Sequence, residues 1–257
     1  MKTKYPMEAF ALSMIIYTRT FHEAWLFGIV VLFITTLSLV IDDYILRNLP
    51  QWSRRLSITI LSVSLTYSFY GVLLKELLGV TPTIQDMIIH LSLAALIALY
   101  ILQVDEDLDY NVFLWESSVA YLAMLIIGLV REFLSLGQIS GLAVADLAFM
   151  TSGVQKMAIG LLFAGIAIAS LNRIFKYSDL KSYGFLILIP LLLVEQPFIL
   201  GSINENLSFL LSTVTALLLF ISIRMDLIFS RTSKEWKGLP IEMVSMSFIY
   251  LILINIM

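Results

Sequence analysis

The C-terminal stretch of the chain, residues 198–257, reads FILGSINENLSFLLSTVTALLLFISIRMDLIFSRTSKEWKGLPIEMVSMSFIYLILINIM. Two apolar segments flank a basic loop that carries Arg224, Arg231, Lys234 and Lys237. Each apolar segment is long enough to cross the roughly 30 Å hydrocarbon core of a bilayer as a helix. This alternation of apolar spans and basic loops predicts a protein that crosses the membrane several times.

The composition of the whole chain supports this prediction. Of its 257 residues, 60% are hydrophobic and 14% are charged. A soluble domain is typically about 45–50% apolar and about 25% charged. Because lipid offers no hydrogen bonds to an open strand edge, the spanning segments are expected to be helices. The predicted fold class is therefore an all-α integral membrane protein.

Apolar runs recur along the full length and predict nine transmembrane helices. They lie near residues 7–20, 24–46, 56–78, 84–103, 112–133, 157–172, 184–202, 206–224 and 239–257. Residues 137–156, between the fifth and sixth spans, contain several glycines and Asp146. Their pattern predicts a surface or partly re-entrant segment, because irregular backbone at membrane depth needs cover from protein or water.

The basic residues set the predicted orientation. Most of the 16 lysines and arginines lie at the N-terminus or in loops after even-numbered spans. Basic residues are retained on the cytoplasmic side. The N-terminus is therefore expected in the cytoplasm and, after nine spans, the C-terminus outside.

Composition also limits the chemistry of the chain. It contains no cysteine, which excludes disulfides and any zinc or iron–sulfur site held by its own thiolates. The two histidines, His22 and His90, lack metal-ligand spacing and are expected at membrane interfaces. We therefore expect no metal site and no cofactor in this chain. A net charge of −3 gives no indication of a nucleic-acid partner.

Three short motifs carry a resemblance over the first part of the chain. Residues 35–39 read TTLSL, residues 54–58 read RRLSI and residues 128–137 read GLVREFLSLG. In this order they resemble motifs of the RnfE/NqrD-type membrane subunits of the Rnf and Nqr electron-transfer complexes. The resemblance implies a six-helix domain over residues 1–176.

The remainder resembles a different subunit of the same complexes. Residues 187–201 read ILIPLLLVEQPFILG, and the terminal loop and span follow the order of RnfA/NqrE-type subunits. This implies a three-helix half domain over residues 182–257. The predicted orientation places Arg131 outside and its counterpart Arg224 inside, as an inverted-repeat bundle requires.

The chain departs from the family where the iron–sulfur ligands belong. Family subunits supply cysteines to a 2Fe–2S cluster within the membrane. The corresponding positions here are Leu12, Leu99 and Pro197, and none of them can bind iron. In the implied fold these former cluster positions converge near the midplane and are filled by apolar side chains.

Three acidic residues are candidates for an ion pathway. Glu195 lies in the middle of the seventh span, where a charged carboxylate is costly and usually faces a cavity or a partner. The alternative is a neutral, hydrogen-bonded glutamic acid beside Gln196. Asp42 and Asp43 are the other two, and the alternative for them is a local ion pair with Arg47, about one turn away. Arg131 and Glu132 are expected to be interfacial anchors.

The resemblance implies a subunit of a redox-driven, ion-translocating complex in the inner (cytoplasmic) membrane, with other membrane subunits and lipid as its partners. Such a subunit is not catalytic by itself, and its part in an oxidoreductase reaction stays open. Two alternatives remain. One is a stand-alone secondary transporter or substrate-binding membrane protein on the same scaffold, which Glu195 and the nine-span count favour. The other is a purely structural assembly subunit.

Overall fold

The computed structural model describes residues 4–77, 79, 83–104, 108–144, 150–177 and 234–256, together with isolated positions between 187 and 222. The helices are α1 (Met7–Ile16), α2 (Phe21–Tyr44), α3 (Gln51–Val72), α4 (Ile84–Gln103), α5 (Tyr110–Leu136), α6 (Met157–Ile174) and α9 (Leu239–Ile256). Short helical turns lie at η1 (Leu46–Asn48), η2 (Leu73–Leu77), η3 (Ser152–Gln155) and η4 (Lys234–Trp236). A two-stranded hairpin pairs β1 (Gln138–Ile139) with β2 (Leu142–Ala143).

Local sequence signals begin and end these helices. Thr20 caps α2 by accepting a hydrogen bond from the backbone of Glu23, and Thr83 forms a capping box with Asp86 at the start of α4. Gly137 ends α5 in the left-handed conformation, with φ of 67°, which glycine adopts without strain. The starts of α2 and α4 and the end of α5 therefore follow from their capping residues.

Four helices of the described part are long and apolar enough to cross a membrane: α2, α4, α5 and α6. This is the architecture of a multi-pass, all-α membrane protein, as the composition predicted. The bounds of α4 agree with the predicted span, and α5 extends beyond its predicted span at both ends. The predicted spans 184–202 and 206–224 fall largely outside the described residues, and the count of nine stays a prediction.

Two predicted spans differ from what the structure contains. The chain leaves the helix after Ile16, so α1 has ten residues and a length of about 15 Å, half of a bilayer core. The third span is helical, but α3 carries too many polar residues to count as an apolar span.

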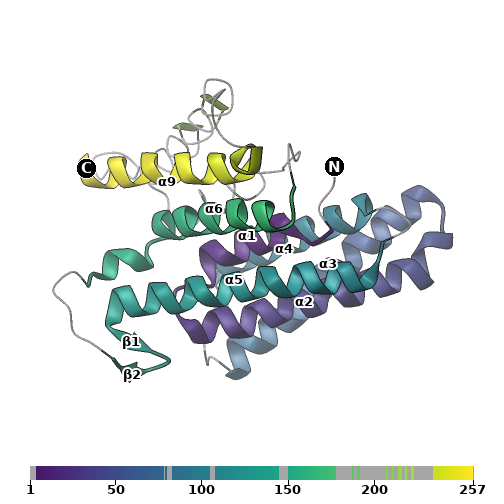
Figure 1. The fold of residues 1–257 in the computed structure, drawn as a ribbon. Helices are drawn as coiled ribbons and strands as arrows, with labels where there is room; N and C mark the ends of the chain where they lie inside the picture. Colours follow the sequence, from purple (N-terminus) through teal and green to yellow (C-terminus); the bar gives the residue numbers. More distant parts are fainter. Residues whose placement is uncertain are drawn as a thin grey trace.

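The bundle is built around α1. Nine of its ten residues are buried, and it packs against α6, α5, α2 and α4. Figure 1 shows α1 enclosed by longer helices, with α9 lying along the outer side of α6. The contact with α9 is close because Gly165 leaves room for the backbone of Pro240. A short buried helix at the centre means that its polar backbone ends must be satisfied inside the protein.

Candidate functional site

Arg131 lies on the buried face of α5, and its side chain has no exposed surface. Its guanidinium donates hydrogen bonds to the hydroxyl of Thr18 and to four backbone carbonyls. The acceptors are Ile15 O (3.1 Å), Thr18 Oγ1 (2.8 Å), Val154 O (3.2 Å), Gln155 O (2.9 Å) and Lys156 O (3.2 Å). The planar fork of arginine suits such an array, and its charge is favourable at the carbonyl end of a helix. Arg131 thus holds the end of α1 against the segment that enters α6.

Glu132, the next residue, secures the other side of the same connection. Its carboxylate accepts a hydrogen bond of 2.7 Å from the backbone N–H of Phe21, the first residue of α2, and one of 3.4 Å from Gly141 in the hairpin. An anion at a helix N-terminus is favourable. The two side chains therefore fix the turn between α1 and α2 inside the bundle. The prediction that Arg131 and Glu132 are interfacial anchors is wrong, since both are buried.

A second buried cluster gathers four rings. Tyr17 stacks on Phe27 with ring centroids 3.9 Å apart, and Tyr70 lies 5.1 Å from Phe27 and 4.7 Å from His90. Among the described residues, the hydroxyls of Tyr17 and Tyr70 and the Nε2 of His90 have no hydrogen-bond partner. The hydroxyl of Ser13 lies next to Tyr70 without meeting hydrogen-bond geometry. His90 is therefore part of the core rather than the interface.

A third polar cluster closes the bundle at the N-terminal segment. The backbone N–H of Lys4 donates to the hydroxyl of Tyr177 (3.0 Å), which in turn donates to the carboxylate of Glu116 (2.6 Å). Tyr100 donates to the carbonyl of Lys4 (2.7 Å). Burial raises the pKa of Tyr177, which follows the end of α6, and the hydrogen bond to Glu116 raises it further. The polar groups of this cluster are hydrogen-bonded to one another. They hold the N-terminal segment against the rest of the bundle.

The two acidic candidates on α2 are in ion pairs. Arg54 at the start of α3 binds the carboxylate of Asp42 with both Nε (2.9 Å) and a terminal nitrogen (2.7 Å), and this carboxylate is nearly inaccessible. Asp43 pairs with Arg47 at 2.6 Å, the local pair that the spacing predicted. Asp42 differs from its predicted alternative, because its partner lies across the α2–α3 turn rather than on the same helix.

The former cluster positions are partly described. Leu12 is fully buried in α1, and Leu99 is partly buried in α4, which contacts α1. Pro197 and the candidate Glu195 lie outside the described residues. The structure therefore does not bring the predicted site residues into one described group, and Asp42 and Asp43 belong to the α2–α3 turn.

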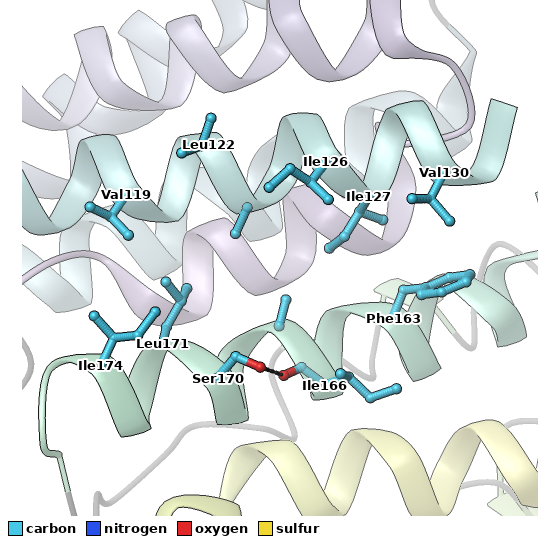
Figure 2. A pocket seen from close by; sticks show the side chains of 12 residues that line it. Val119, Leu122, Ile126, Ile127, Val130, Phe163, Ile166, Ser170, Leu171 and Ile174 are labelled. Atoms are coloured by element: carbon cyan, nitrogen blue, oxygen red, sulfur yellow. Dashed lines mark hydrogen bonds between the residues drawn. The ribbon is translucent and has the colours of Figure 1, made fainter. Parts of the chain in front are cut away.

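Within the described residues, no group of three or more histidine, aspartate or glutamate side chains is arranged to hold a metal ion. A cavity of about 460 Å³ lies between α5 and α6 and is lined almost entirely by aliphatic side chains (Figure 2). Its one hydroxyl, Ser170, is bonded to the carbonyl of Ile166. This groove has the character of a lipid-facing surface and offers no reactive group.

Comparisons with known proteins give no match to this chain, whether to a family model, to a curated protein or to a solved structure.

Proposed function

We propose that the chain is a membrane subunit of an Rnf/Nqr-like, redox-driven ion-translocating complex, without iron–sulfur ligands of its own. In this role it sits in the inner membrane with its N-terminus in the cytoplasm, and its partners are other membrane subunits. Its contribution is to the scaffold and the ion path rather than to electron transfer through a cluster.

The observation that carries the proposal concerns residues 128–137, one of the motifs on which the resemblance rests. Gly128 packs against Ala24 at the start of α2, and Arg131 and Glu132 hold the ends of α1 and α2. A motif with such contacts is built into the centre of the bundle. These contacts support the resemblance better than an apolar stretch of sequence would, because Arg131 and Glu132 each make specific hydrogen bonds.

The burial of Leu12 adds to this support. The resemblance places a cluster ligand at this position in the first, short helix, and here an apolar side chain fills it without exposed surface. Filling a former site with aliphatic atoms keeps the dispersion contacts that an empty cavity would forfeit.

Affinity capture tests the proposal. The tagged chain is purified in mild detergent from the membranes of its native host and is assayed for flavin, iron and associated polypeptides. The proposal expects flavin- or iron-containing membrane subunits in fixed stoichiometry, and none with an unrelated tagged membrane protein. A monodisperse single chain without redox-active partners would contradict it.

The second candidate is a stand-alone transporter or substrate-binding membrane protein. The observation that favours it is the cluster of Tyr17, Tyr70 and His90, whose buried polar atoms have no hydrogen-bond partner in the described part of the chain. Buried polar groups in a membrane protein usually face a pathway or a ligand. The same capture experiment separates the two, because a stand-alone protein purifies without redox subunits.

A further inference from the structure

The helix α3 is unusually polar for its place in the bundle. Its 22 residues would extend about 33 Å, and it packs between α2 and α4, two of the helices that can cross a membrane. Because α3 begins where α2 ends and packs along both α2 and α4, it is long enough and suitably placed to return across the same thickness. Its polarity therefore lies inside a membrane-spanning bundle and needs a reason.

The buried residues of α3 follow one another at intervals of four. They are Ile58, Ser62, Thr66 and Tyr70, each with at most 1% of its surface exposed. Residues four apart lie one above the other on a helix, so this series forms a buried stripe along α3. Three of its four members carry hydroxyls, and none of these hydroxyls has a hydrogen-bond partner within the described residues.

Charged and titratable groups lie at both ends of this stripe. At one end is the pair of Asp42 and Arg54, with the unpartnered hydroxyl of Ser38 one turn before Asp42 on α2. At the other end His90 contacts Tyr70, and the partly exposed Asp86 lies one turn earlier on α4.

The end near His90 is also lined by α1. Tyr17 follows α1, and its ring contacts Tyr70 at 5.5 Å. Glu23 and Arg19 are the charged groups near Tyr17 on that side. Together with the stripe, these groups form a polar series along α3 that only Ile58, between Arg54 and Ser62, interrupts.

The fold would be more stable if apolar side chains replaced the hydroxyls of this stripe. Each buried hydroxyl left without a partner lowers the stability of the fold, and a valine or leucine in its place would avoid that cost. Buried polar groups are normally satisfied by protein or by internal water. The hydroxyls of the stripe thus point to water between α3 and its neighbours.

The chemistry of the groups indicates what moves along this water. Hydroxyls and a neutral imidazole both donate and accept hydrogen bonds, which is what transfer of a proton along a chain of water requires. A metal cation would need several carboxylate or carbonyl oxygens at one place. Along the stripe the polar side chains are hydroxyls, and the carboxylates lie only at its ends.

We propose that the buried face of α3 lines a water-filled proton pathway that runs from the Asp42–Arg54 pair to His90 and Asp86. The pathway does not depend on whether the chain is a subunit of a redox complex or a stand-alone protein. Its tests use the chain alone, so they can fail while the capture experiment succeeds, and the reverse.

Water in the pathway can be tested directly, because the chain contains no cysteine that would react in the background. Single cysteines replace Ser62 or Thr66 on the stripe and, as matched controls, Ser64 or Ser68 on the exposed face of the same helix. Membrane vesicles are treated with silver ions, and the remaining thiols are then counted with a maleimide after denaturation.

The proposal expects silver to block S62C and T66C but not S64C and S68C. A thiol in a hydrated path ionises and reacts, whereas a thiol in lipid stays protonated. If S62C and T66C remain unblocked, the stripe is dry and the proposal fails. If all four are blocked, α3 lies in bulk water and the proposal fails as well.

Proton movement is tested with the purified full chain in liposomes that contain a pH-sensitive dye and are held at an inside-negative potassium diffusion potential. Proton uptake should exceed that of protein-free liposomes. T66V and Y70F should lower its initial rate about tenfold, which corresponds to about 1.4 kcal/mol on the barrier.

The controls T59V and Y67F change the same residue types on the exposed face of α3 and should leave the rate unchanged. Uptake equal to that of protein-free liposomes would overturn the proposal. Equal effects of buried and exposed substitutions would also overturn it, since the rate would then not depend on the stripe.

Discussion

At the scale of single residues, Arg131 joins segments that are far apart in sequence. Its donors reach the end of α1 at Ile15 and the backbone of residues 154–156. The carbonyl of Ile15 is buried, and loss of this donor would cost about 1–3 kcal/mol there, whereas the bonds to residues 154–156 are partly buried. A single guanidinium therefore stabilises the centre of the bundle, where helix ends would normally need water.

Replacement of Arg131 by lysine tests this role. Lysine keeps the charge but lacks the planar fork, so several carbonyls lose their donor. We expect the free energy of unfolding to fall by about 2–4 kcal/mol, measured as a lower melting midpoint in detergent. The control is Arg173→Lys at the exposed end of α6, which should change stability by less than about 0.5 kcal/mol. Equal melting of both variants would contradict the role of Arg131.

The two aspartates of α2 offer a second comparison. Asp42 is buried and binds Arg54 through two hydrogen bonds, whereas the Asp43–Arg47 pair keeps side-chain exposures of 35% and 26%. We expect Asp42→Asn to cost about 1.5–3 kcal/mol and Asp43→Asn less than about 1 kcal/mol. Thermal melting of the two variants at matched salt would show the difference. A larger loss for Asp43→Asn would mean that the turn between α2 and α3 is held differently.

The buried position of Arg131 could be predicted from the sequence, but its partners could not. Arg131 is in phase with the buried positions Ala120, Met124 and Gly128 of α5, so the pattern could have placed it on the inner face. Its partners could not be predicted, because most of them are backbone carbonyls of distant segments and leave no trace in the apolar pattern. His90 was misplaced for a similar reason, since it packs against the ring of Tyr70 from another helix.

At the scale of elements, small residues decide how closely the helices approach. A β-carbon at Gly160 in α6 would lie 2.6 Å from the carbonyl oxygen of Ile15 and 3.0 Å from the guanidinium of Arg131. A β-carbon at Gly28 in α2 would clash with the ring of Tyr121. Glycines at helix contacts are typical of membrane bundles, where packing replaces the hydrophobic effect.

Gly160→Ala is therefore expected to destabilise the fold by about 1–3 kcal/mol, because the backbone of α1 cannot give way. Gly71→Ala is the matched control in α3, where an added β-carbon meets nothing within 4 Å. There the change should raise helix stability by up to about 1 kcal/mol. Melting midpoints that shift in the same direction for both variants would contradict this account of the α1–α6 contact.

At the scale of the whole molecule, the hydropathy pattern predicted a helical membrane protein and most of the helix positions in the described part. It failed for the length of the first helix, which it predicted as a spanning segment. The ten-residue α1 is buried by its neighbours, so its hydropathy resembles that of a spanning helix. In α3, which covers much of the third predicted span, polar residues on both faces make the helix less hydrophobic than its neighbours α2 and α4.

We propose that the polar helix α3 crosses the membrane inside this bundle. The most direct measurement labels single cysteines at Asn48 before α3, at Gly79 after it and at Lys237 before α9, with an impermeant maleimide in intact cells and in inverted vesicles. We predict that N48C and K237C react from the cytoplasmic side and that G79C reacts from the opposite side. Reaction of N48C and G79C from the same side would contradict the claim, because α3 would then not span the membrane.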